Sequence, residues 1–193
     1  LSLIGMNAEG VGVCTSNLTP TDARAGANYL FTITRALRAR SAGEAARSIA
    51  DARRLSGHDF LFCDVAQVVN VETTARLNVL TTIATGVHVH TNHYRSPALA
   101  RVAFDRAELA GSEWRAARLT RAIERALRPL TPGACWELLA DNTRGDGAIC
   151  NEDLDGRYGD VATAATAVLR PARGEMLACA GGARLGEKRA FRL

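Results

Sequence analysis

The spacing of apolar residues predicts β-strands in three parts of the chain. At the start, two apolar segments flank a turn rich in glycine and asparagine, which is typical of a β-hairpin. After Gly57, and again near the C-terminus, apolar and polar residues alternate and strand-forming residues dominate. The predicted strands are residues 1–4, 11–17, 59–64, 68–73, 77–83, 87–90, 163–169 and 176–180.

Helical periodicity separates these strand regions. Apolar residues recur at helical spacing in four segments, whose bounds are given below. Ser41 with Glu44 forms a capping box at the start of the second of these segments. Thr131 followed by Pro132 is the N-cap and first turn of the last one. The arginines of the first two segments are expected to form a solvated face. The predicted helices are residues 23–40, 42–54, 112–128 and 132–139.

The order of these elements predicts an α+β fold. A hairpin, a pair of helices, antiparallel strands, further helices and a final hairpin do not alternate as β-α-β units would, and they suit two sheets packed between helical layers. The 193 residues, of which 47% are hydrophobic, suffice for one core, and no linker or repeat divides them. We therefore expect a single domain over residues 1–193.

Composition narrows the class of function. The formal net charge is +4, but the basic residues, which are arginines except for Lys188, are dispersed and do not form the basic stripe of a nucleic-acid-binding protein. No apolar run has the length of a membrane span, so no membrane contact is expected. The five cysteines show no paired close spacing, which argues against a disulfide framework and favours a reducing, cytoplasmic location.

Three of the four histidines lie together, in the segment His-Val-His-Thr-Asn-His-Tyr at residues 88–94. One interpretation is a metal site, because the neutral imidazoles of His88, His90 and His93 could converge on one divalent ion. The other makes Asn92 the working residue, since a side-chain amide at a strand end can donate a hydrogen bond to an oxyanion. The flanking histidines and threonine would then hold that amide in place.

The motif His-Thr-Asn-His-aromatic at residues 90–94, taken with two others, resembles the C45 family of autoproteolytic acyltransferases and hydrolases. The other two are Gly-Met-Asn-x-x-Gly-Val at residues 5–11 and Ser-x-Trp-Arg-x-x-Arg at residues 112–118. This family includes the acyl-coenzyme A:6-aminopenicillanic acid acyltransferases and is distantly related to the bile salt hydrolases. The resemblance runs along most of residues 5–182.

The resemblance implies an N-terminal-nucleophile hydrolase fold, which is an αββα four-layer sandwich. It also implies that an N-terminal cysteine, exposed by autoproteolysis, attacks the amide or thioester of a small-molecule acyl substrate. The cysteine's own α-amino group, with a pKa of ~8, takes the thiol proton. The acyl group then passes to water or to an amine, and no cofactor is implied.

Site residues follow from the same resemblance. Asn92 matches the oxyanion donor. Asn17 falls where the bile salt hydrolases carry an asparagine that faces the nucleophile, so it would line the substrate carbonyl or the same oxyanion hole. His90, Thr91 and His93 would support Asn92 by hydrogen bonds.

Two carboxylates of the central strands also resemble the family pattern. Asp64 precedes a short turn and Glu72 lies in the next predicted strand. Nothing in the sequence brings them together for acid–base chemistry, so we expect both to be structural.

The nucleophile implied by the resemblance lies outside this chain. In the family it precedes the Gly-Met-Asn hairpin, so we expect a fragment that lacks its first strands and is inactive without the missing N-terminal segment of the same polypeptide. Cys14 or Cys150 remains open as an ordinary cysteine–histidine nucleophile. The other open alternatives are a metal-dependent hydrolase based on the three clustered histidines and a non-catalytic, degenerate relative.

Overall fold

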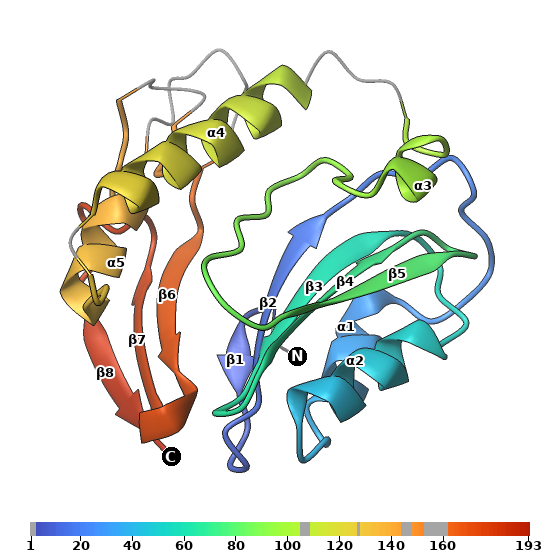
Figure 1. Ribbon diagram of the computed structural model, residues 1–193, viewed down its shortest axis with the longest axis horizontal. Coiled ribbons are helices and arrows are strands. Elements are labelled where there is room, and N and C mark those ends of the chain that lie inside the picture. The colour runs from blue at the N-terminus through green and yellow to red at the C-terminus, as the bar shows by residue number, and fades with distance from the viewer. Residues whose placement is uncertain (1–2, 105–108, 127, 144–147, 153–161) are drawn as a thin grey trace.

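Two antiparallel sheets form the framework of the molecule (Figure 1). The computed structural model describes residues 3–104, 109–126, 128–143, 148–152 and 162–193. Within these residues the first sheet has the strand order β1-β2-β3-β4-β5 and the second has the order β6-β7-β8. The strands are β1 (Gly5–Met6), β2 (Gly12–Asn17), β3 (His58–Cys63), β4 (Val68–Thr73), β5 (Asn78–Ile83), β6 (Ala165–Arg170), β7 (Glu175–Ala180) and β8 (Arg189–Arg192).

Helices lie on the outer sides of both sheets (Figure 1). The helices α1 (Tyr29–Ala36) and α2 (Ala42–Ala50) cover the first sheet, where α2 packs on β3 and β4. The helix α5 (Pro132–Leu139) packs on the second sheet and contacts α4 (Leu109–Arg125), whereas α3 (Pro97–Ala100) is a single turn. Among the described residues, none of the helices combines the length and the apolar character needed to cross a membrane.

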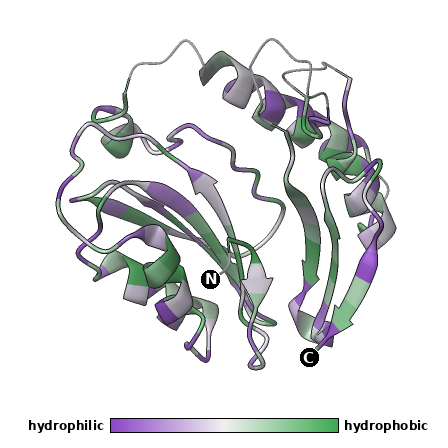
Figure 2. Cartoon of the chain, turned by 180° about the vertical axis from the view of Figure 1, so that it is seen from behind, coloured by the Kyte–Doolittle hydropathy of each residue, from purple (hydrophilic) through white to green (hydrophobic). Residues whose placement is uncertain are grey.

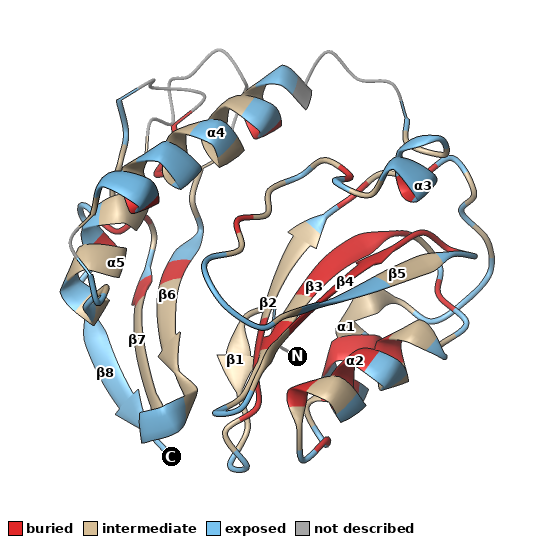
Figure 3. Ribbon diagram, in the orientation of Figure 1, coloured by how far each residue is buried: buried red, intermediate tan, exposed pale blue. Residues whose placement is uncertain are grey.

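The main hydrophobic core fills the space between the first sheet and helices α1 and α2. Successive strand residues point to opposite faces, so Phe60 and Phe62 of β3 face the helices whereas Asp59 faces away from them. Figure 3 shows the resulting buried layer in β3, β4 and α2. Its fully buried members include Val11, Val13, Ile33, Ile49, Phe60, Phe62 and Val71.

A smaller core lies between α5 and the second sheet. Trp136, Cys179 and Ala183 are buried together, and the indole N–H of Trp136 donates to the carbonyl oxygen of Ala183 at 2.9 Å. Both β6 and β7 consist largely of apolar residues (Figure 2). The two sheets touch where β2 passes β6, because a Cβ atom at Gly12 would lie 3.1 Å from Cδ1 of Leu169.

The predicted strands are confirmed with two corrections and one omission. Of the strand predicted over residues 1–4, residues 1–2 lie outside the described residues and residues 3–4 form a bend, so the first described strand is Gly5–Met6. Residues 87–90 are irregular rather than a strand, because the carbonyl of Val89 accepts a hydrogen bond from the Arg95 guanidinium at 2.8 Å instead of from a neighbouring strand. The short and exposed β8 was not predicted.

The helix predicted over residues 23–40 is much shorter, because α1 begins only at Tyr29. Before it, the main-chain N–H groups of Arg24 and Ala27 donate to carbonyls within residues 53–55. The N–H of Ala27 would pair within a helix that began at residue 23, and here it is used by Arg53 instead.

The other helices begin close to their predicted starts. The Ser41 hydroxyl accepts from the N–H of Glu44 at 3.2 Å, and the Thr131 hydroxyl accepts from the N–H of Ala134 at 3.1 Å, so both predicted caps are confirmed. The helix α2 ends at Ala50, earlier than predicted. The helix α4 is described from residue 109 to 125, and residue 127 of the helix predicted over residues 112–128 lies outside the described residues.

The side chain of Asn7, in the Gly-Met-Asn motif, has a structural role. Its Oδ1 accepts from the N–H groups of Glu9 and Val11, which closes the turn between β1 and β2. Its Nδ2 donates to the carbonyls of Leu37 and Ala39 at 2.9 and 2.8 Å. One side chain therefore joins the first hairpin to the end of α1.

Arg54 corrects the expectation that the arginines of this region form a solvated face. Only 4% of the residue is exposed, and burial lowers the pKa of its guanidinium. The guanidinium joins the end of α2 to the turn between β4 and β5. Its acceptors are the main-chain carbonyls of Ile49, Ala50, Ala52, Thr74 and Leu77.

We expect Arg54→Lys to lower the free energy of unfolding by about 2 to 4 kcal/mol, because an ammonium group has fewer donors and leaves buried carbonyls unpaired. Urea denaturation measures this difference. The matched control is Arg38→Lys at an exposed position, which should change the free energy by less than about 0.5 kcal/mol. Equal losses at the two positions would contradict the role assigned to Arg54.

His58, the first residue of β3, is buried against α1. Its ring stacks on Tyr29 with the centroids 4.1 Å apart, and burial lowers its pKa to about 4. The unfolded chain, with a histidine pKa of about 6.5, binds more protons than the folded protein between these two values. The stability due to neutral His58 is therefore complete above this window and is lost as the pH falls through it.

Between about pH 7 and pH 4, the free energy of unfolding should fall by about 3 kcal/mol more in the natural protein than in His58→Phe. Phenylalanine keeps a ring against Tyr29 but has no group that titrates. Urea denaturation of both proteins at the two pH values gives the difference. The same pH dependence in both would show that His58 is not the responsible group.

Candidate active site

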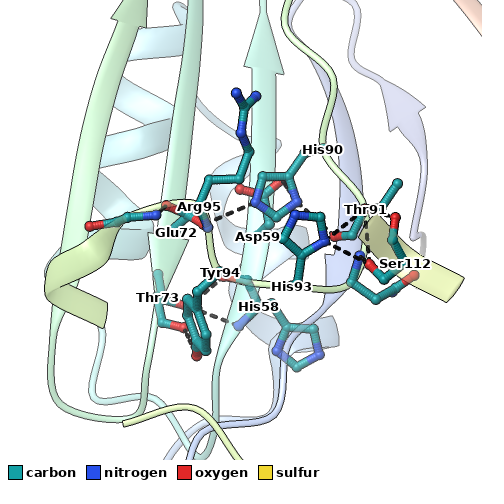
Figure 4. A network of polar contacts seen from close by, with 12 residues as sticks. His58, Asp59, Glu72, Thr73, His90, Thr91, His93, Tyr94, Arg95 and Ser112 are labelled. Carbon is teal, nitrogen blue, oxygen red and sulfur yellow. Dashed lines mark hydrogen bonds and ion pairs between the residues drawn. The ribbon is translucent and has the colours of Figure 1, made fainter. Parts of the chain in front are cut away.

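An irregular segment of residues 88–96, which we call the asparagine loop, runs over the inner face of the first sheet, opposite helices α1 and α2 (Figure 4). It carries Asn92 near its middle. Because the loop contains neither helix nor strand, its polar groups depend on partners from other elements. The hydrogen bonds described below come from β2, β4 and α4, and β3 contributes an ion pair.

Glu72 of β4 fastens the asparagine loop at both ends. Its carboxylate accepts hydrogen bonds from Nε2 of His90 at 3.0 Å, from the N–H of Arg95 and from the N–H of Ser96 at 2.8 Å. Only 4% of Glu72 is exposed. Burial would raise its pKa, but the hydrogen bonds and the charge of His90 lower the pKa overall, so Glu72 is ionised.

His90 has hydrogen-bond acceptors at both ring nitrogens. Nδ1 lies 2.7 Å from the carbonyl oxygen of Thr91 and 3.4 Å from Oδ2 of Asp59, while Nε2 faces Glu72. Carbonyl and ionised carboxylate oxygens only accept, so each nitrogen must carry a proton. Burial alone would lower the pKa of His90, but Glu72 and Asp59 raise it overall. His90 is therefore an imidazolium, without a lone pair for a base or a metal ligand.

Asp59 is the cross-strand partner of Glu72 in the β3–β4 register. Two carboxylates directly opposite each other repel, and the imidazolium of His90 lies between them. Burial is the main reason that the pKa of Asp59 is raised to about 7; the charge of His90 opposes this shift and that of Glu72 adds to it. Near neutral pH the pair therefore carries more negative charge on Glu72 than on Asp59.

Ser112, near the start of α4, holds the three central residues of the asparagine loop. Its hydroxyl oxygen accepts the N–H of Asn92 at 2.7 Å and lies 2.9 Å from both Oγ1 of Thr91 and Nδ1 of His93. The hydroxyl of Thr91 donates to the carbonyl of Ser112 at 3.0 Å. The loop is thereby joined to helix α4 through three consecutive residues.

The side-chain amide of Asn92 is fixed at both of its polar atoms. Oδ1 accepts from Nη2 of Arg115 at 3.0 Å, and Nδ2 donates to the main-chain carbonyl of Asn17 at 3.2 Å. An arginine only donates and a carbonyl only accepts, so the orientation of the amide is unambiguous. Asn92 is exposed, and the hydrogen bond to Asn17 uses one of the two N–H bonds of the amide. The other N–H can meet a bound molecule.

The structure brings together the residues that the sequence motifs single out. Asn17 lies at the end of β2 and meets Asn92, although through its main chain and not its side chain. His90, Thr91 and His93 contribute hydrogen bonds around Asn92, to Glu72, Ser112 or each other. Their roles in a reaction stay predictions.

Sequence reasoning assigns no site role to four residues that the structure brings here. Glu72 is predicted only as a structural residue, Ser112 and Arg115 are named only within a family motif, and Asp59 is not singled out. Ser112 and Arg115 lie one helical turn apart and so share a face of α4, and their spacing is the signal that could have identified them. Asp59 and Glu72 are a like-charged cross-strand pair, which becomes visible only once the strand register is known.

The geometry does not favour the metal-site interpretation of the clustered histidines. Both ring nitrogens of His90 face acceptors, and Nδ1 of His93 lies against the hydroxyl of Ser112. The rings stack side by side, with centroids 6.1 Å apart for His88 and His90 and 6.4 Å apart for His90 and His93. Over the described part of the chain, no three His, Cys, Asp or Glu side chains are grouped as a metal ion would require.

The five cysteines are free thiols, of which Cys150 and Cys179 are buried whereas Cys14, Cys63 and Cys135 are partly buried. Burial raises the pKa of Cys14 to about 12, and it also raises the pKa of Cys63, Cys135 and Cys150. A raised pKa keeps a thiol protonated and poorly nucleophilic. The structure therefore gives no support to Cys14 or Cys150 as the nucleophile of an ordinary cysteine–histidine pair.

Comparison with known proteins assigns the chain to a family. The chain matches the model of the family described as acyl-coenzyme A:6-aminopenicillanic acid acyl-transferase over residues 3–184. A search of curated proteins finds no match. The matched range covers nearly all of the 193 residues and includes the site from Asn17 to Arg115. As its motifs predicted, the chain belongs to the acyl-coenzyme A:6-aminopenicillanic acid acyl-transferase family.

Proposed function

We propose that this chain forms the larger part of an enzyme that transfers or hydrolyses acyl groups through an N-terminal cysteine. Membership of the acyltransferase family supports acyl chemistry on small molecules. The observation that carries the proposal is the exposed amide of Asn92, which Arg115 and the Asn17 carbonyl fix in one orientation. A donor held in advance suits the oxyanion that forms during acyl transfer.

The arrangement of the elements supports the fold that this chemistry needs. Two neighbouring sheets carry helices on their outer sides, as in the αββα sandwich of the N-terminal-nucleophile hydrolases (Figure 1). In this proposal the first strands and the nucleophile belong to an N-terminal segment of the same polypeptide that precedes Leu1. That segment would bring its cysteine next to Asn17 and Asn92.

The proposed reaction begins when the cysteine thiol gives its proton to the cysteine's own α-amino group, whose ordinary pKa of ~8 suits this role. The sulfur then attacks the carbonyl carbon of an amide or thioester, and the carbonyl oxygen becomes an oxyanion. When this adduct collapses, the C–N or C–S bond breaks and the ammonium group gives its proton to the leaving amine or thiol. Water or an amine takes the acyl group from the thioester by the same steps.

Asn92 would stabilise the oxyanion through the N–H that Asn17 does not use. The positive charge of Arg115 at Oδ1 withdraws electron density from the amide and strengthens this donor. The side chain of Asn17 would line the substrate carbonyl from the end of β2. His90, Thr91 and His93 would hold Asn92 in place and take no part as bases, because the α-amine fills that role.

The coding DNA upstream of Leu1 tests the proposed nucleophile. We expect an in-frame cysteine codon some tens of codons before Leu1, and we expect that cysteine to be the N-terminal residue of the mature protein. DNA sequencing and N-terminal sequencing of the purified protein check the two statements. A natural start at or just before Leu1 would remove the nucleophile, and the non-catalytic alternative would then take its place.

In the full-length enzyme, Asn92→Ala should lower kcat/KM for acyl-coenzyme A thioesters by on the order of 10²- to 10³-fold, because it removes an oxyanion donor worth ~3 kcal/mol. Release of coenzyme A, followed with a thiol-reactive chromogenic reagent, measures the rate. The matched control is Asn78→Ala, which removes an amide of β5 that donates to the Ala50 carbonyl, and it should leave the rate unchanged. A value for Asn92→Ala within a few fold of the natural enzyme would refute the assignment.

A further inference from the structure

We propose that Glu72 is a positioning residue that acts on acyl transfer through Asn92, by fixing both ends of the asparagine loop. The inference rests on the proposed function of Asn92 as the oxyanion donor. It concerns a residue that the sequence motifs mark only as structural.

A single carboxylate holds the loop on both sides of Asn92. His90 precedes Asn92 by two residues, and Arg95 and Ser96 follow it within four; all three donate to Glu72. Figure 4 shows Glu72, His90 and Arg95 side by side on the inner face of the sheet. Removing the carboxylate would release both ends together, whereas Ser112 contacts only the centre of the loop.

The asparagine loop also supplies positive charge to two neighbouring carboxylates of the first sheet. Asp59 and Glu72 stand opposite each other, and the loop delivers the imidazolium of His90 between them, at 3.4 and 3.0 Å. The charge of Arg95 also acts on Asp59 in the favourable direction, from the same loop. The two carboxylates and the cationic loop therefore attract each other where little water screens them.

A buried ion pair of this kind is a poor source of stability. Removing Glu72 and His90 from water costs free energy that offsets their attraction, and apolar residues would fill the same space at least as favourably. Three donors that converge on one carboxylate do, however, define the position of the loop. Loss of Glu72 alone would leave the charge of His90 buried without its partner, and it would lower the free energy of unfolding. It would also release the three donors that define the position of Asn92.

A double-mutant cycle in the full-length enzyme tests the inference, with acetyl-, hexanoyl- and decanoyl-coenzyme A as probes. Glu72→Gln keeps the shape of the side chain and should lower kcat by on the order of 10²-fold. KM should stay within about 2-fold, because Glu72 does not contact the substrate. In the Asn92→Ala background the same substitution should change kcat by less than about 3-fold, because Glu72 then has no donor to position.

Each outcome of the cycle has a separate meaning. If Asn92→Ala alone leaves the rate unchanged, the proposed function fails and the inference fails with it. If Asn92→Ala lowers the rate but Glu72→Gln lowers kcat equally in both backgrounds, the proposed function stands and positioning through Asn92 is overturned. An unchanged kcat for Glu72→Gln alone also overturns it.

Two further variants guard against an effect on folding. Glu72→Asp keeps the charge but withdraws the carboxylate by one methylene group, so it should show the same non-additivity with a smaller loss of kcat, even if Glu72→Gln does not fold. Asp64→Asn is the matched control. Asp64 follows the last residue of β3, at the other end of the strand from His58, and its carboxylate accepts from the N–H of Ala42 at 2.7 Å. The substitution should lower stability without changing kcat in either background.

Discussion

A loop without regular secondary structure must have its polar groups paired by other elements, and this constraint organises the candidate site. Glu72 on β4 holds the two ends of the asparagine loop, and Ser112 on α4 holds its centre. Arg115 and the Asn17 carbonyl then fix the amide at its middle. The exposed amide is therefore set in one orientation only when the first sheet and helix α4 are both in place.

The histidine cluster also acquires a physical meaning from this arrangement. A cluster of imidazoles suggests a metal site when their lone pairs can converge on one ion, but His90 has acceptors at both nitrogens and is a buried cation. That cation separates two carboxylates that β-sheet pairing places opposite each other. The histidine segment therefore resembles a set of metal ligands in the sequence, but in the structure it belongs to a network of charged groups.

Local patterns predicted most of the fold, because strand alternation and helix caps depend on neighbours in the sequence. The caps at Ser41 and Thr131 are examples. The errors arose where contacts between residues far apart in the sequence determine the local structure. The main chain before α1 is hydrogen-bonded to residues 53–55 instead of forming a helix, and Arg54 is buried among carbonyls rather than solvated. In the site, the motif pointed to Asn92 and its neighbours, but Ser112, Arg115 and the opposition of Asp59 to Glu72 depend on packing and register.

The hydrogen bond between Asn92 and position 17 has a consequence for how such a site can change over generations. Asn92 meets the main-chain carbonyl of Asn17, and every amino acid carries that group. A mutation at position 17 alters the side chain presented at the end of β2 without removing the acceptor that orients Asn92. Ser112 and Arg115, in contrast, contribute side-chain groups to the loop and cannot be exchanged so freely. The side chain at position 17 can therefore change while the hydrogen bond that orients Asn92 is kept.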